Sequence, residues 1–428
     1  MISASVYRWA DFVTISNYAL LSDTSRSGLG VTMLSALILI VSILVGAVLV
    51  WPRLANAPLW RATITPLASI IGSGFLVLGP ILHVSYGGFA PVVMLVLCAM
   101  SYLVGGAIRY NIARIADGSG MSPFVERLEL TSSAVLAFAF FVSVAYYLNL
   151  FGSFGVSLTG FNDRFHANML TTAIFLLILG VGWTRGFTAL ERLEQVSVGL
   201  KLAIIAGLVF GLAVYFGEAA RSDTLKFDAP GLTGWAAITL MGGLIVTVQG
   251  FETSRYLGAT YDAGVRIRSM KLAQWISTVI YVIYISLITY AFDADPLSLD
   301  ETAIIDLMQV VAPILPLMLV VAALSAQFSA AIADTSGSGG LIAEVSKGKI
   351  SEKLAYALLV GFGILITWTA DIFQIISYAS RAFAAYYAIQ SCIAALLAAK
   401  RGDAWKSVLF GAIVLVCAGI VAFGAPVE

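Results

Sequence analysis

Residues 63–83 read TITPLASIIGSGFLVLGPILH, and the five residues at their centre, Ile70-Ile71-Gly72-Ser73-Gly74, decide the fold of the chain. Apolar sequence of membrane-spanning character lies on both sides of this centre. A helix inside a lipid bilayer has to satisfy its own backbone N–H and C=O groups, so two glycines around a serine at mid-span indicate an interruption. We therefore expect the helix to break between Gly72 and Gly74.

Such a break exposes backbone N–H groups where the second half-helix starts and carbonyl groups where the first half-helix ends. The first kind of end attracts an anion such as a carboxylate and the second a cation such as an ammonium group, so a zwitterion fits both. A second candidate break is Gln249-Gly250-Phe251-Glu252. Two broken helices in corresponding halves of a chain are typical of a secondary transporter whose site lies at the bilayer midplane.

The composition places the chain in the membrane class. It is 60% hydrophobic and only 11% charged, whereas soluble domains are about 25% charged, and its mean hydropathy is +0.95. The formal net charge is zero, so we expect no nucleic acid or acidic macromolecule as a partner. A polytopic protein surrounded by the lipid bilayer is predicted.

The apolar runs predict twelve membrane-spanning helices. The first is residues 31–50; a cleaved signal peptide is the alternative, but the run is long and Pro58 hinders cleavage after Ala57. Residues 1–30 form a polar tail, either a surface helix or unstructured. The other spans are expected at residues 63–85, 89–110, 131–156, 170–183, 193–216, 235–258, 272–292, 313–343, 354–370, 372–399 and 405–423.

Basic residues support this topology, because Lys and Arg gather in cytoplasmic loops. If the helix at residue 63 starts inside, most of the 24 Lys and Arg residues fall in inside loops, and an acidic loop at residues 293–306 falls outside. Both termini are then predicted outside. We expect a multi-pass protein of a bacterial inner (plasma) membrane.

Ten of the spans divide into two sets of five, residues 63–216 and 235–399, each of which begins with a candidate break. An odd number of helices per set inverts the second set relative to the first. Residues 31–50 and 405–424 are extra helices at either end.

The two breaks also carry a family resemblance. Residues 70–75, followed by Gly79-Pro80, resemble the first-helix motif of the amino acid–polyamine–organocation (APC) superfamily. Residues 249–252 with the basic loop at 266–268 are similar to its sixth-helix motif, and residues 185–201 are similar to the fifth helix of proton-coupled members. The resemblance covers roughly residues 60–400 and implies an all-α, LeuT/APC-like 5+5 inverted-repeat fold. The extra N-terminal helix and the single helix after the core depart from the common pattern.

The resemblance also implies a substrate site. A substrate carboxylate would bind the backbone N–H groups of Gly72, Ser73 and Gly74, and its amine would meet carbonyl groups near Ala68, Ile70, Val248, Gln249 and Gly250. The alternative is that these glycines only allow close helix packing. Packing is the interpretation that we prefer for Gly207 and Gly211, which form a GxxxG pattern.

Ionisable residues inside a span cost roughly 2.5–3.5 kcal/mol each at a helix centre, so each is a functional candidate. Lys201 lies about nine residues, or roughly 13 Å, from the inner end of its span. In proton-coupled relatives a lysine in this helix takes the place of a sodium ion, and Lys201 could load and release a proton there. A snorkelling lysine near the inner interface is the alternative.

Asp334 and Thr335 are further candidates for ion coupling. The pattern Ala331-x-x-Asp334-Thr335 resembles the one that lines that sodium site, and it would set an acid opposite Lys201 to share one proton. The alternative register uses Ala326 and Ser329 and leaves Asp334 nearer the cytoplasm. Sodium coupling stays open because both candidates are hard oxygen ligands, but a nearby ammonium group favours protons.

Four more residues are candidates for the site or its ion pairs. Glu252 could cap the second half-helix and bridge neighbouring helices, or act directly on the proton or the substrate. Tyr146 could cover the substrate, and Phe251 could close the pocket from the other repeat. Arg381 could form an ion pair or orient a substrate carboxylate.

These features favour a secondary active transporter that moves an amino acid or related small amine by alternating access with a proton. A sodium-coupled transporter and a non-transporting, sensor-like relative are the alternatives. An enzyme is not expected, because the sequence has no paired-His metal motif, nucleophile elbow or P-loop. No cofactor or metal is predicted, since His83 and His166 have no metal-binding spacing.

Overall fold

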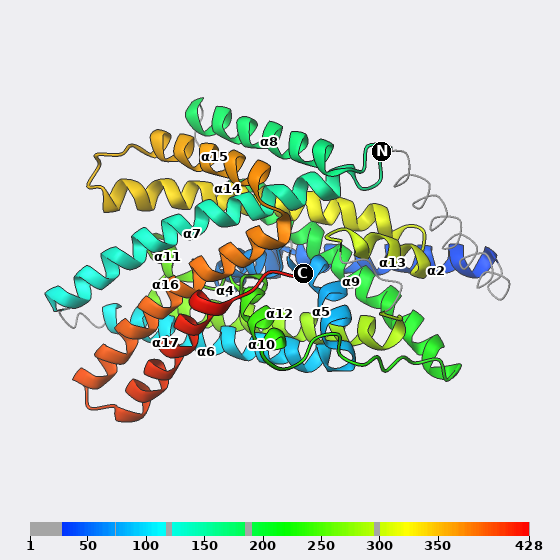
Figure 1. Cartoon of the computed structure of the whole chain (residues 1–428). Helices are drawn as coiled ribbons and strands as arrows, with labels where there is room; N and C mark the ends of the chain where they lie inside the picture. Colours follow the sequence, from blue (N-terminus) through cyan, green and yellow to red (C-terminus); the bar gives the residue numbers. More distant parts are fainter. Residues whose placement is uncertain (1–27, 73, 117–121, 185–190, 295–299, 428) are drawn as a thin grey trace.

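The structure is a computed structural model, and it describes residues 28–72, 74–116, 122–184, 191–294 and 300–427 (Figure 1). Every secondary-structure element in these residues is a helix. The elements are α2 Gly28–Leu49, α3 Pro52–Ala55, α4 Pro58–Ile70, α5 Gly74–Tyr86, η1 Gly87–Phe89, α6 Ala90–Ala116, α7 Pro123–Val156, α8 Arg164–Thr184, α9 Glu191–Arg221, α10 Gly234–Gly243, η2 Ile245–Val248, α11 Thr253–Tyr256, η3 Leu257–Ala259, α12 Ala263–Ala291, α13 Ala303–Val311, α14 Leu315–Val345, α15 Glu352–Thr369, α16 Ile372–Lys400 and α17 Ala404–Phe423.

Ten helical segments among the described residues are long and apolar enough to span a membrane. One of them runs from Gly74 to Ala116, because the 3-10 turn η1 joins α5 directly to α6. The predicted count of twelve includes the two interrupted spans, whose pieces α4, α10 and α11 are each too short to be counted by length. The predicted tail at residues 1–30 lies almost wholly outside the described residues.

Several helices begin earlier than the apolar runs suggested. Helix α7 starts at Pro123, where the Ser122 hydroxyl accepts a hydrogen bond from the Val125 N–H, and α12 starts after Asp262, whose carboxylate caps Val265. Hydropathy detects only the lipid-embedded part of a helix, whereas a polar N-cap lets the helix extend into water. Helix α13 was not expected, because the sequence predicted only an acidic loop in this region. The helix buries Ile304, Leu307 and Met308.

The long helices pack as a bundle. Helices α8, α15 and α14 lie side by side and pack together with α7, which also contacts α16 (Figure 1). Helix α12 packs on α4 and α6, and α16 forms a hairpin with α17. The two interrupted spans lie within this bundle, so their polar backbone ends are surrounded by protein.

Helix α2 packs against α9 through the predicted GxxxG pattern. A Cβ atom on Gly207 would lie 2.2 Å from Ser42 Oγ and 3.1 Å from the Ile38 carbonyl oxygen, and one on Gly211 would lie 2.9 Å from Ile38 Cδ1. These small residues let the two helices approach closely, so the packing interpretation is confirmed.

Arg381 has a different role from the two that the sequence suggested. Its Nε donates to the Val421 carbonyl oxygen at 2.7 Å, and a second guanidinium nitrogen lies 3.3 Å from that of Ala422. These carbonyl groups belong to the last turn of α17, which has no further turn to accept from. The guanidinium therefore satisfies a helix end, as cations near a helix C-terminus do.

The residues after α17 fold back onto α10. The Ala425 N–H donates to the Thr239 carbonyl oxygen at 2.9 Å, and the Ser377 hydroxyl donates to that of Gly424 at 3.2 Å. Beside them, a cavity of about 240 Å³ lies between α10 and the last turn of α5.

An exposed ion pair joins the loop before α10 to the end of α12. Lys226 Nζ lies 2.9 Å from a carboxylate oxygen of Asp293, and this hydrogen bond raises the pKa of Lys226. The Lys226 N–H also donates to the Tyr290 carbonyl oxygen at 3.0 Å. The loop is thereby held against α12.

The packing of α2 on α9 can be tested with two substitutions on one helix. Gly207→Val should lower the free energy of unfolding by about 1–3 kcal/mol, because the added atoms meet the Ser42 hydroxyl and Ile38 of α2. Gly199→Val is the matched control, because a Cβ atom there would meet nothing within 4 Å. Denaturant unfolding in detergent would measure both variants, and equal losses of stability would argue against this helix contact.

Candidate functional site

The first break lies where the sequence predicted it. Helix α4 ends at Ile70, α5 begins at Gly74, and the Ile71 N–H closes the last turn of α4 on the Leu67 carbonyl oxygen at 3.0 Å. Gly72 lies between the two helices, and Ser73 lies outside the described residues. The interruption is confirmed, whereas a carboxylate on the N–H groups of Gly72–Gly74 stays a prediction.

The second break is longer and more irregular than expected. Helix α10 ends at Gly243, a 3-10 turn follows, and the chain is extended at Gln249 before the single turn of α11. We expected the span to continue as a helix from the break at residues 249–252 to about residue 258, but this second half is only α11 and a 3-10 turn. Gly250 has a φ of +114°, which favours glycine because it has no Cβ atom.

The two breaks are in direct contact. A Cβ atom on Gly250 would lie 2.3 Å from the Cβ of Ser69, and one on Gly74 would lie 3.0 Å from the Cβ of Thr247. The Gly74 position would also bring it to 2.8 Å from the Tyr146 hydroxyl. Glycine is thus required at both breaks by the close approach of the other one.

Side chains from other helices donate to carbonyl groups at both breaks. Lys201 Nζ on α9 lies 2.5 Å from the Ala68 carbonyl oxygen, and Lys201 is only 3% exposed. On α12, the Tyr281 hydroxyl lies 2.9 Å from the Ile70 carbonyl oxygen and 2.6 Å from that of Thr247. The Ser101 hydroxyl donates to the Val248 carbonyl oxygen at 3.1 Å. Three carbonyl groups expected to meet a substrate amine, those of residues 68, 70 and 248, therefore have donors from the chain itself.

Tyr281 and Ser101 were missed by the sequence reasoning. No motif marks them, but a hydroxyl group at the middle of an apolar span needs a partner, and that requirement is a usable signal. Tyr281 is fully buried, as is Tyr284 one turn later.

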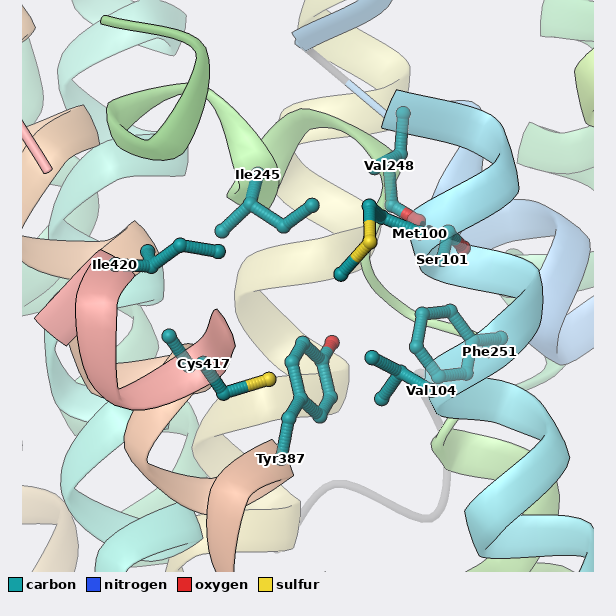
Figure 2. Close-up of a pocket in the computed structure, with 10 residues that line it drawn as sticks. Met100, Ser101, Val104, Ile245, Val248, Phe251, Tyr387, Cys417 and Ile420 are labelled. Atoms are coloured by element: carbon teal, nitrogen blue, oxygen red, sulfur yellow. Dashed lines mark hydrogen bonds between the residues drawn. The ribbon is translucent and has the colours of Figure 1, made fainter. Parts of the chain in front are cut away.

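The two candidate aromatic residues, Tyr146 and Phe251, have different neighbours. Tyr146 lies on α7 against Gly74, and the hydroxyl of the adjacent Tyr147 accepts from the Gln249 side chain at 2.9 Å. Phe251 instead stacks on Tyr387 of α16, with ring centroids 5.3 Å apart. Figure 2 shows Phe251, Tyr387 and Cys417 around a cavity of about 10 Å³, which is about the space that one water molecule needs.

Glu252 is completely buried and lies at the start of α11. Its Oε2 accepts from the Gly250 N–H at 2.9 Å and from the Tyr387 hydroxyl at 3.0 Å. These contacts match the bridging role that the sequence suggested, since they join the second break to α16. A role in proton coupling stays a prediction.

Asp334 of α14 contacts α7 close to the candidate Tyr146. Its carboxylate accepts from the Ser143 hydroxyl, one turn before Tyr146 and Tyr147, and Asp334 is 6% exposed. The Thr335 hydroxyl donates to the Ala331 carbonyl oxygen of its own helix at 2.6 Å.

The register of α14 against α9 bears on the coupling candidates. The Ser197 hydroxyl, one turn before Lys201, donates to the Ser325 carbonyl oxygen at 2.8 Å. Asp334 lies nine residues, or roughly 13 Å, further along α14. This contact favours the register in which Ala326 and Ser329, rather than Asp334 and Thr335, approach the level of Lys201.

A polar network joins α11 to α7 and α16. Arg255 pairs with Glu129 of α7 at 2.5 Å and also donates to the Gln390 side chain of α16 at 2.5 Å. The Gln390 side chain donates to the Ser132 hydroxyl at 2.8 Å, and its oxygen accepts from the side-chain amide nitrogen of Asn111 at 2.9 Å. The Arg255 side chain is 11% exposed and joins α11 to two long helices.

Comparisons with known proteins agree with this arrangement. A family profile described as "APC superfamily transporter" matches residues 52–424, which include both breaks, Lys201 and Asp334. An uncharacterized protein of Aquifex aeolicus (strain VF5) is 40% identical over 388 residues, which cover 88% of this chain and 93% of the relative. Family membership makes this a multi-pass integral membrane protein with a LeuT-like fold, and a transporter rather than an enzyme. The chain belongs to the APC superfamily of transporters.

Proposed function

We propose that this protein is a secondary active transporter that moves an amino acid or a related small amine by alternating access, coupled to protons. The observation that carries this proposal is the buried Lys201 ammonium on the Ala68 carbonyl oxygen, less than one turn before the first break. A fixed cation occupies the negatively polarised end of α4, where a coupling ion would otherwise bind.

Substrate recognition would use the freed ends of the half-helices. The N-terminal end of α5, at Gly74, supplies positive backbone dipoles for a carboxylate. A carbonyl oxygen has two lone pairs, so the carbonyl groups near Ile70 and Val248 can accept from a substrate amine in addition to their present donors. The Gln249 Oε1 atom is buried and has no hydrogen-bond partner among the described residues, so it is a further acceptor.

The contact between the two breaks supports a cycle in which the interrupted helices move together. Gly250 lies against Ser69 and Gly74 lies against Thr247, so the two breaks form one packed unit. We propose that the interrupted helices rock against the other helices of the two repeats, residues 63–216 and 235–399, as in other inverted-repeat transporters. The Glu129–Arg255 network would close the cytoplasmic side, where the basic loops place it.

Proton coupling follows from the position of Lys201. While Lys201 is protonated, its ammonium holds the end of α4; loss of the proton removes that charge and weakens the hold. Asp334 is the second candidate, since it is an acid next to Ser143 on the tyrosine-bearing helix.

Transport itself is tested by counterflow in proteoliposomes. Vesicles loaded with an unlabelled amino acid or amine should take up the same labelled compound from outside, and replacing sodium with choline should leave the rate within about twofold. Uptake that needs sodium would reject proton coupling. No exchange with any member of a broad panel of amino acids, polyamines and organic cations would favour a sensor-like protein.

Lys201→Ala tests the coupling assignment. The variant should exchange substrate but lose accumulation driven by a pH gradient, because the group that binds the proton is gone. Lys271→Ala is the matched control. Lys271 is exposed at the start of the apolar part of α12, so this variant should accumulate substrate as the native chain does. Normal uphill uptake by Lys201→Ala under a pH gradient would show that another residue couples the proton.

A further inference from the structure

The Tyr281 hydroxyl lies between carbonyl groups from both breaks. One carbonyl oxygen belongs to Ile70, the last residue of α4, and the other to Thr247 in the 3-10 turn after α10. We propose that Tyr281 is a positioning residue that ties the two breaks together, so that they move as one unit during the transport cycle. The part of this inference that concerns transport rests on the proposed function.

A hydroxyl group donates only one proton, so the two carbonyl groups share it. Both are at half-helix ends, where backbone carbonyl groups lack helical partners, and both lie inside the bundle where water is scarce. If the two breaks move apart, the hydroxyl can follow only one of them, and a carbonyl oxygen on the other is left without this donor. Such a loss is costly for a buried acceptor, so the shared proton favours joint movement.

The Tyr281 ring is held in place. Its exposed fraction is 0%, and its ring meets that of Phe75, in the first turn of α5, edge-on at 5.3 Å between centroids. The hydroxyl is therefore fixed by packing before it donates to either carbonyl group. Since α12 also packs along α4, one rigid helix positions both breaks.

The same helix provides an internal comparison. Tyr284 is also 0% exposed and also packs on Phe75, at 4.2 Å between centroids. Its hydroxyl donates at 3.1 Å to the Leu76 carbonyl oxygen within α5, and among the described residues it donates to no carbonyl group of the second break. Tyr281 and Tyr284 thus match in chemistry, burial and helix, and differ in what their hydroxyl groups join.

Amide hydrogen exchange on the full chain in detergent tests the tie directly. Tyr281→Phe removes one oxygen atom and should raise exchange by about tenfold or more in both residues 66–72 and residues 244–251. Tyr284→Phe should leave both segments within about twofold. A rise in neither segment, a rise in only one, or the same rise in Tyr284→Phe would overturn the proposal. This measurement needs no transport, so it stands even if the proposed function fails.

Counterflow then separates positioning from simple loss of structure. Tyr281→Phe should lower the turnover per folded protein by about tenfold and leave the substrate dissociation constant within about threefold, whereas Tyr284→Phe should change neither. An unchanged turnover would overturn the positioning role in transport. If Tyr281→Phe does not fold, Phe75→Leu keeps the hydroxyl but removes the ring that orients it, and should raise exchange in both segments; no rise would reject the tie.

Discussion

The structure depends on the need to satisfy backbone groups that two broken helices release inside a bilayer. Water is not available there to accept or donate, so the freed groups need protein partners. Carbonyl groups at the two breaks accept hydrogen bonds from the side chains of Lys201, Tyr281 and Ser101. The Ser380 hydroxyl donates to the Gly243 carbonyl oxygen at the end of α10 at 2.6 Å. The polar residues of the central spans are thus arranged around backbone ends, and the candidate site is made of the same ends.

The positions of the breaks could be predicted because they follow from local chemistry. Gly72 and Gly250 interrupt apolar runs, and an apolar run of sufficient length indicates a span whatever surrounds it. Lys201 could be singled out for a similar reason, since a charge inside a span is costly wherever it points. The GxxxG contact of Gly207 with α2 belongs to the same group, although the sequence did not show that α2 was the partner.

The partners could not be predicted, because they come from distant parts of the chain. Tyr281 is 211 positions from Ile70, and Lys201 is 133 positions from Ala68. Hydropathy and spacing show that a group needs a partner but not which helix supplies it. The same limit applies to Phe251, which stacks on Tyr387 of α16, and to Arg381, whose partners are the last carbonyl groups of α17. The register of α14 was also beyond a pattern of small and hydroxyl residues, since it depends on the contact of Ser197 with Ser325.

The small cavity beside the second break has a consequence for motion in an otherwise tightly packed centre. It is bordered by Ile245, Val248 and Phe251, three residues of the segment that moves in the proposed cycle (Figure 2). Close-packed interiors resist displacement, and an apolar void gives one moving piece somewhere to go. A larger side chain that filled this space would add contacts and heat resistance but remove free volume from the hinge. Under the proposed cycle, stability and transport rate would therefore oppose each other at this cavity.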